Sequence, residues 1–224
     1  MTHHSIAIDG PAGAGKSTMA KALAKALGYV YVDTGAIYRT VGYHMNLMGI
    51  GPKDIDGITR LIDDVNLEIQ YDEEGTQHMI LNGDDVNDEI RTPEMSMIAS
   101  TISAHKIVRD FLLDTQRDIA RNYDTVMDGR DIGTVVLPKA EVKIFLTASP
   151  EVRAQRRCEQ LKAAGKKVDE KKILQEIIQR DQQDMNRPIA PLKQAEDAVL
   201  VDSSAMGVDE VVNKLLEIVA QKLA

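Results

Sequence analysis

The glycine-rich segment GPAGAGKS, residues 10–17, constrains the fold of this chain more than any other feature. It matches G-x-x-x-x-G-K-[ST], and it stands between a short apolar run and a helical pattern, as a phosphate-binding loop must. Backbone N–H groups in such a loop turn toward a phosphate, and the helix start adds partial positive charge. We expect Lys16 to reach the outer phosphates of a nucleoside triphosphate and Ser17 to coordinate Mg²⁺. The predicted ATP-binding residues are Gly10, Pro11, Ala12, Gly13, Ala14, Gly15, Lys16, Ser17 and Thr18.

Short apolar runs alternate with helical patterns along the chain, which indicates a parallel α/β sheet. The runs expected to form buried strands are residues 6–8, 30–32, 125–127, 142–146 and 199–201. The clearest helical patterns cover residues 16–27, with Gly28 placed to end the helix, and residues 208–223. The predicted fold class is α/β: one P-loop domain over residues 1–224, with a five-stranded parallel sheet flanked by helices.

An inserted segment interrupts this alternation. Roughly 90 residues separate the second and third runs, whereas a crossover needs about 30. Apolar and polar residues alternate over residues 65–71, which predicts a half-exposed strand; the turn signal DEEG, a strand near residues 79–81 and the hairpin signal Asn82-Gly83 follow. Helices are expected through residues 93–122. We therefore expect a small antiparallel-sheet subdomain at about 61–122, inserted into a core of about 1–60 and 123–224.

Composition limits the classes of partner. The formal net charge is −8, no long Lys/Arg run occurs and Trp is absent, so we expect no nucleic-acid partner. No run of 18 apolar residues occurs, and we expect no membrane partner. Cys158 is the one cysteine, which fits a reducing cytoplasmic location. No partner-binding motif is visible, and we expect a monomer.

Three of the expected strands end in aspartate, at Asp9, Asp33 and Asp128. Ligands of open parallel sheets bind beyond the carboxyl ends of the strands, so we expect these ends to converge on one crevice. The third strand continues as VMDGRDIGT, which presents two carboxylates and the guanidinium of Arg130 together. An internal Asp–Arg pair in a simple turn is the alternative interpretation.

Further arginines occur in three segments of the chain, and two of these segments contain Arg39 and the pair Arg180 and Arg187. Arg39 lies one to two helical turns beyond Asp33, and a solvated helix residue is its alternative interpretation. Arg180, Asp184 and Arg187 share one helix face by spacing, and Pro188 disfavours helix at Arg187; an exposed ion-pair ladder is the alternative here.

The third segment begins a helix at Ser149-Pro150 and contains Arg153, Arg156 and Arg157. With the glycine-containing stretch KAAGKK after it, this segment resembles a mobile basic lid, which we place at about 151–170. A solvated basic helix is the alternative interpretation.

Phosphoryl transfer to a small anionic acceptor would need such arginines, because its catalysis is mainly positioning and charge neutralisation. A nucleotide-driven switch is the competing class. GTPase switches carry a guanine-reading [NT]-K-x-D segment, which this sequence lacks, whereas an ATP-driven switch or regulatory module stays open.

Six segments in one order carry a resemblance to a family. GPAGAGKST, DTGAIYR, the pair Ser100 and Arg109, DGRDIGTVV, KIFLTAS and RDxxDxNRxxAPL together closely resemble the bacterial cytidylate kinases, which are nucleoside monophosphate kinases. The resemblance runs from end to end, and the inserted segment resembles this family's enlarged monophosphate-binding region. It implies transfer of the γ-phosphoryl group of MgATP to CMP or dCMP, giving CDP or dCDP and ADP.

The resemblance also implies roles for individual residues. Arg39, Arg130 and Arg187 would hold the acceptor phosphate; Ser100, Arg109 and Asp131 would read cytosine; Arg180 and Asp184 would hold the ribose; Asp33 and Thr34 would lie at the acceptor end. The catalytic set would be Lys16, Asp128, Arg130 and the lid residues Arg153 and Arg157, with Mg²⁺ at Ser17 and at Asp33 or Asp128 through water.

The chemistry of the base agrees with this implied reading. Cytosine offers an N4 amine donor beside the N3 and O2 acceptors, which suit a carboxylate and an arginine. Uracil reverses the pattern at positions 3 and 4, so an Asp–Arg pair would face mismatched groups. A kinase of the same architecture that takes UMP remains the alternative enzyme.

Overall fold

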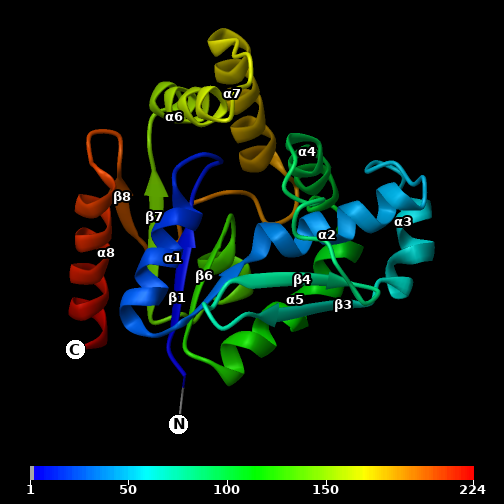
Figure 1. Cartoon of the computed structure of the whole chain (residues 1–224). Helices are drawn as coiled ribbons and strands as arrows, with labels where there is room; N and C mark the ends of the chain where they lie inside the picture. The colour runs from blue at the N-terminus through cyan, green and yellow to red at the C-terminus, as the bar shows by residue number, and fades with distance from the viewer. Residues whose placement is uncertain (1–2) are drawn as a thin grey trace.

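The central sheet contains five parallel strands, and the computed structural model describes residues 3–224 (Figure 1). The strands are β1 (Ser5–Asp9), β2 (Val30–Asp33), β6 (Thr125–Gly129), β7 (Val142–Thr147) and β8 (Val199–Asp202), in the order β2-β6-β1-β7-β8. In register, Asp9 lies beside Gly129 and Asp33 beside Asp128. The predicted five-stranded parallel sheet is confirmed, and β1, β2 and β6 end at one edge.

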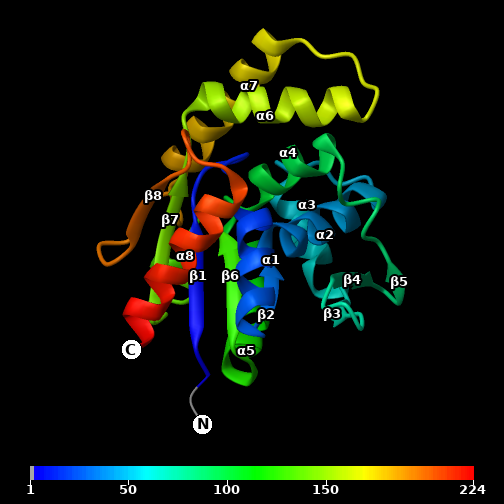
Figure 2. The same ribbon diagram turned by 60° about the vertical axis from the view of Figure 1, so that its left-hand side comes forward.

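Residue alternation along the inner strands divides the core into two layers. Ile6 and Ile8 of β1 pack with α1 (Lys16–Leu27) and α8 (Val208–Leu223), which lie on the same side of the sheet (Figure 2). Ala7 of β1 and Met127 of β6 face the opposite layer, which contains α2 (Thr34–Leu47) and α5 (Lys106–Asn122). Since both faces are covered, the inner strands read as continuous apolar runs.

The segment between β2 and β6 contains a second, antiparallel sheet. Its strands are β3 (Leu67–Tyr71), β4 (Gln77–Leu81) and β5 (Asp84–Asp85), in that order. Asn82 and Gly83 both have positive φ, 53° and 95°, as a two-residue hairpin turn requires. The first strand begins at Leu67 rather than at Val65 as expected, because a 3₁₀ turn, η1 (Ile62–Asp64), precedes it and ends in a bond from the Val65 N–H.

Helices complete this segment on either side of the small sheet. They are α3 (Ile55–Leu61) before it and α4 (Pro93–Ile102) and α5 after it, so the helices expected through residues 93–122 are confirmed. Thr92 caps α4 by accepting a hydrogen bond from the Met95 N–H, and proline occupies the first turn, where no amide donor is needed. The side chains of this segment share one apolar core with α2 and the sheet.

Two long helices stand above the carboxyl edge of the sheet (Figure 1). These are α6 (Pro150–Ala163), capped by Ser149, and α7 (Glu170–Asn186), capped by Asp169. They share a small apolar cluster that contains Cys158 and Ile173. Helix α7 ends at Asn186, and Arg187 has an extended backbone before Pro188, as the sequence predicted.

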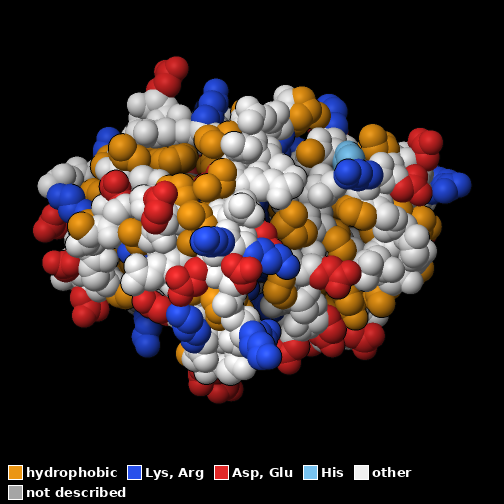
Figure 3. Space-filling model, turned by 90° about the horizontal axis from the view of Figure 1, so that it is seen from above, with side chains coloured by type: hydrophobic (Ala, Val, Ile, Leu, Met, Phe, Trp, Pro, Cys, Tyr) orange, Lys and Arg blue, Asp and Glu red, His pale blue; other side chains and the backbone are white. Residues whose placement is uncertain are grey.

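Basic and acidic side chains are interspersed on the face seen from above (Figure 3). None of the helices within residues 3–224 combines the length and apolar composition needed to cross a membrane.

Candidate active site

The phosphate loop connects β1 to α1 with backbone shapes that glycine allows. Gly10 has φ of 153°, and a Cβ there would lie 1.9 Å from the carbonyl oxygen of Leu146, so a side chain has no room. Gly15 adopts a left-handed conformation, φ 88°, immediately before the helix begins at Lys16. The Lys16 ammonium is buried and donates to the Pro11 carbonyl at 2.8 Å across the loop. The start of α1 thus offers backbone N–H groups and a cation to a phosphate.

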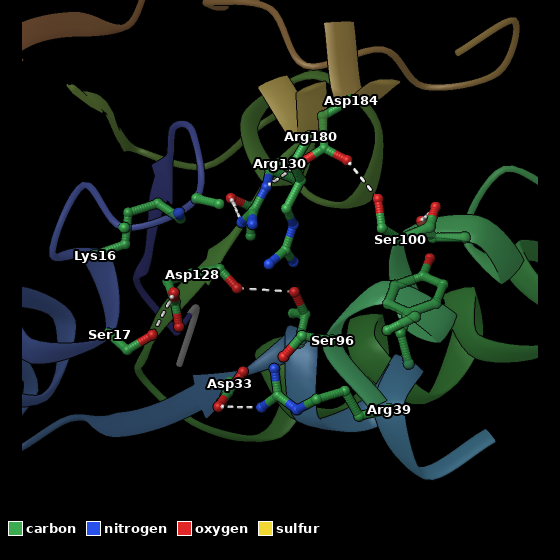
Figure 4. A pocket seen from close by; sticks show the side chains of 18 of the residues that line it. Lys16, Ser17, Asp33, Arg39, Ser96, Ser100, Asp128, Arg130, Arg180 and Asp184 are labelled. Atoms are coloured by element: carbon green, nitrogen blue, oxygen red, sulfur yellow. Dashed lines mark hydrogen bonds and ion pairs between the residues drawn. The ribbon is translucent and has the colours of Figure 1, made fainter. Parts of the chain in front are cut away.

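A cavity of about 310 Å³ opens between this loop and the helices α2, α4 and α7 (Figure 4). Six cationic side chains line it, namely Lys16, Arg39, Arg109, Arg130, Arg180 and Arg187. Four carboxylates line it too, those of Asp33, Asp128, Asp131 and Asp184. Cations therefore outnumber carboxylates inside a protein whose formal net charge is −8, which favours an anionic ligand here.

Asp128 lies at the end of β6 between two hydroxyl donors. Ser17 donates to one carboxylate oxygen at 3.1 Å, and Tyr31 donates to the other at 2.8 Å. Burial, followed by the nearby Asp33, raises the pKa of Asp128 to about 6. Burial, followed by the charge of Arg130, lowers the pKa of Lys16 to about 7. Burial therefore disfavours the charged forms of both groups, and a triphosphate beside Lys16 and a cation beside Asp128 would stabilise them.

Asp33 organises the start of α2. Its carboxylate accepts from the Ala36 N–H at 2.8 Å, which caps the helix, and from Arg39 at 3.0 Å. The buried side chain of Gln77 on β4 accepts from the Asp33 N–H at 2.7 Å and donates to its carbonyl at 3.3 Å. Arg39 is therefore positioned by a strand end that the inserted sheet contacts directly.

Asp131 forms a buried ion pair with Arg109 of α5, and Arg187 approaches its other oxygen at 3.9 Å. Burial, partly offset by Arg109, raises the pKa of Asp131. A short π-helix, η2 (Ile132–Val136), follows Asp131 directly, and Asp9 accepts from the first two N–H groups of this helix at 2.8 Å. Asp9 thereby fixes the turn on which Asp131 is presented.

Arg130 and Asp184 form a further ion pair of the cavity. The Arg130 Nε donates to Asp184 at 2.8 Å, and Ser100 of α4 donates to the other oxygen of the same carboxylate at 3.1 Å. Burial raises the pKa of Asp184, but Arg130 and Arg187 outweigh it and lower the pKa overall. Ser100 therefore contacts Asp184, while Asp131 pairs with Arg109.

Several guanidinium nitrogens of the cavity have no hydrogen-bond partner within residues 3–224. They are Nε of Arg39, Nε of Arg180, and Nε and Nη2 of Arg187, all shielded from solvent. Burial, followed by the charge of Arg130, lowers the pKa of Arg180 to about 10. Buried donors without acceptors are costly, so the cavity is prepared for a ligand that supplies acceptor oxygens.

Most of the predicted site residues line this one cavity. All ten predicted CMP-binding residues do so, and so do Ala12, Gly13, Gly15, Lys16, Ser17, Thr18 and Asp128. Gly10, Pro11 and Ala14 belong to the loop but lie outside the lining. The strand end at Asp9 leads into the loop that lines the cavity, but the Asp9 carboxylate itself is not part of the lining, because it accepts from the N–H groups of η2.

The predicted lid arginines are placed differently from the other site residues. Arg157 is exposed on α6 and does not line the cavity. Arg153 is buried, 3% exposed, and bonds other protein groups, so the alternative interpretation of a solvated basic helix is wrong for it. Arg156 bonds Ser203 after β8.

Seven lining residues carried no assignment from the sequence, namely Gly35, Tyr38, Ser96, Ala99, Ser103, Gly129 and Gln160. Tyr38 precedes Arg39, and the Arg109 guanidinium lies 5.7 Å from the centroid of its ring. Ser103 accepts from Arg187 at 2.9 Å. Gln160 reaches the cavity from α6. Tyr38 could have been found from its place in DTGAIYR, whereas no sequence pattern marks Ser103 or Gln160.

Comparison with known proteins agrees with the geometry. The family model described as cytidylate kinase matches residues 6–221. A cytidylate kinase of Caldicellulosiruptor saccharolyticus is 49% identical over 214 residues, covering 96% of this chain and 94% of that protein. A cytidylate kinase of Fervidobacterium nodosum is 48% identical over 220 residues, with 98% of each covered.

A solved structure supports the fold alone. An uncharacterized protein from Eubacterium ventriosum aligns with a TM-score of 0.52 at 13% identity, covering 96% of this chain and 97% of that chain.

Proposed function

The chain belongs to the cytidylate kinase family and transfers the γ-phosphoryl group of ATP to CMP or dCMP, and we propose that the arginine-lined cavity is where the acceptor nucleotide binds. The observation that carries this proposal is the convergence of Arg39, Arg130 and Arg187 on one hollow beside the phosphate loop. The triphosphate would lie on the loop and at the start of α1, with Lys16 at its outer phosphates.

The acceptor end of the cavity suits a nucleoside monophosphate. Arg39, Arg130 and Arg187 would hold the phosphate, and the nitrogens of Arg39 and Arg187 that lack a hydrogen-bond partner would gain oxygen acceptors there. Asp184, which already accepts from Ser100 and Arg130, would also accept from ribose hydroxyls, and Arg180, whose charge acts on Asp184, would donate to their oxygens.

The paired Asp131 and Arg109 fit the pairing edge of cytosine. The carboxylate would accept from the N4 amine, and the guanidinium would donate to N3 or O2. Ser100, which the family resemblance assigned to the base, contacts Asp184, so we place it on the ribose side of the acceptor.

The transfer itself is a displacement at the γ-phosphorus. An oxygen of the acceptor phosphate forms the new P–O bond while the bond to the β–γ bridging oxygen breaks, and ADP leaves with that electron pair. Lys16 and Arg130 would neutralise charge on the moving group, and Arg157 is the candidate from the lid, because lids of such kinases close over both substrates.

The donor set near the loop fits Mg²⁺. The Ser17 hydroxyl and the Asp128 carboxylate lie 3.1 Å apart, and Asp33 lies in register on the next strand. These are hard oxygen donors of the kind Mg²⁺ prefers, with one or two carboxylates rather than a full protein cage. When bound, the ion would neutralise the β and γ phosphates; Ser17 would hold it, with Asp128 or Asp33 acting through water.

The other sequence-based predictions remain proposals. They are the division at about 61–122, the lid at about 151–170, a monomeric state, the lack of nucleic-acid and membrane partners, and a cytoplasmic location based on the single cysteine, Cys158. Sedimentation would test the monomeric state, and cell fractionation would test the cytoplasmic location.

A nucleotide panel tests the proposal. Production of ADP is measured with saturating MgATP and each of CMP, dCMP, UMP and AMP in turn. We expect turnover with CMP and dCMP to exceed turnover with UMP. Equal turnover of CMP and UMP would overturn the assignment of Asp131 and Arg109 to the base.

A further inference from the structure

The guanidinium group of Arg153 forms hydrogen bonds to three separate segments of the chain. Its Nε donates to the Ala148 carbonyl after β7 at 2.9 Å, and Nη1 donates to the Ala12 carbonyl in the phosphate loop at 2.9 Å. Nη1 and Nη2 also form a bidentate pair with Asp181 of α7, at 3.0 and 2.6 Å. Both side chains of this pair are buried.

The contacts connect the two halves of the site. Ala12 belongs to the loop expected to hold ATP, while Asp181 lies on the helix that ends in the acceptor-side residues Arg180, Asp184 and Arg187. Arg153 also packs against the loop, since a Cβ added to Gly13 would lie 3.5 Å from the Cβ of Arg153. The pair therefore sets where α7 stands relative to the phosphate loop.

We propose that Arg153 and Asp181 are positioning residues whose buried pair fixes α7 against the phosphate loop, so that the two bound nucleotides are aligned for in-line transfer. This inference rests on the proposed placement of the acceptor nucleotide. It differs from direct contact between Arg153 and the transferred phosphate, because all three guanidinium nitrogens already bond protein oxygens and none lines the cavity.

The double variant Arg153→Met with Asp181→Leu removes the pair and fills its place with apolar side chains. Replacement of a buried ion pair by apolar side chains is often tolerated by the fold, whereas removal of one partner leaves a buried charge. Each nucleotide keeps its own binding groups but loses its alignment, and a small misplacement can lower the rate about 100-fold. We expect kcat to fall by about that factor, with both KM values within about threefold of wild type.

The matched control is the other ion pair between the same helices. Lys162 of α6 and Glu170 of α7 lie 2.9 Å apart, but both are exposed and they bond each other rather than the phosphate loop. Lys162→Met with Glu170→Gln should leave kcat unchanged, because exposed pairs contribute little and this one does not contact the loop.

Asp181→Asn separates positioning from direct phosphate contact. A carboxylate cannot itself stabilise a moving phosphoryl group, so positioning predicts that Asp181→Asn lowers kcat as Arg153→Met does, with a non-additive double variant. Direct contact predicts unchanged or higher kcat for Asp181→Asn, since the guanidinium is released. That result, or wild-type kcat in the double apolar variant, would overturn the inference.

Calorimetric binding distinguishes failure of this inference from failure of the proposed function. CMP and a non-hydrolysable ATP analogue are titrated separately into wild type and the double variant. Wild type that binds no CMP would contradict the proposed function itself. CMP and analogue affinities near wild type in a double variant with low kcat support positioning, whereas loss of affinity in proportion to kcat would overturn it.

Discussion

Replacement of Asp131 with Asn examines how the cavity selects its base. The carboxylate is buried, pairs with Arg109 and lies 3.9 Å from Arg187. Asparagine has nearly the same shape, and its amide oxygen can still accept from Arg109. The substitution therefore changes the charge and hydrogen-bonding character of one group with little change in volume.

The expected magnitude follows from the type of hydrogen bond that is lost. A bond to a charged group contributes about 1.5–3 kcal/mol, against about 0.5–1.5 kcal/mol for a neutral one. Losing the charge should therefore cost about 1–2 kcal/mol, or roughly five- to thirtyfold in kcat/KM for CMP. The amide N–H₂ can donate to O4 of uracil, which the carboxylate cannot, so kcat/KM for UMP should rise.

The assay is the ratio of kcat/KM values for CMP and UMP, measured by coupled release of ADP at fixed MgATP. We expect this ratio to fall at least about tenfold in Asp131→Asn. Because both values come from one preparation, the ratio does not depend on the fraction of folded enzyme. A ratio equal to that of wild type would refute the reasoning that Asp131 faces the base.

Three further predictions concern other parts of the site. Burial raises the pKa of Asp9 from 3.8 to about 6, so its ionisation lowers the stability of wild type as the pH rises through that interval. Relative to wild type, Asp9→Asn should therefore gain about 3 kcal/mol in free energy of unfolding between about pH 4 and about pH 6. A difference in urea unfolding that stays constant with pH would contradict this. Gln77→Leu should raise KM for CMP several-fold at unchanged KM for ATP, because Gln77 holds Asp33 through about 1 kcal/mol per hydrogen bond; Gln70→Leu, at an exposed position on the neighbouring strand, is the control and should change neither. Ser17→Ala should raise the Mg²⁺ concentration for half-maximal turnover at least about tenfold, and an unaltered Mg²⁺ titration would remove Ser17 as a ligand.

Motifs tied to backbone geometry were predictable from the sequence. The loop 10–17 specifies a strand, a tight turn and a helix by its glycines and its neighbours, and α1 begins at Lys16 as predicted. Asn82-Gly83 likewise marked its hairpin, since few other residues accept two successive positive φ angles. Such features depend on a few consecutive residues.

Side-chain directions were less predictable, because they depend on tertiary packing. Asp9 ends its strand like Asp33 and Asp128, yet it turns away to bond the N–H groups of Ile132 and Gly133. Arg153 belongs to a basic cluster that resembles a lid in the sequence, but the Asp181 carboxylate, 28 positions away on α7, binds it. No local pattern records either partner.

A structure of the complex with CMP and a non-hydrolysable ATP analogue would test the site most directly. We expect Arg39, Arg130 and Arg187 to lie within hydrogen-bond distance of the CMP phosphate, and Asp131 to accept from the N4 amine. A CMP phosphate bound outside the cavity, with these three guanidinium groups making no contact to it, would contradict the account.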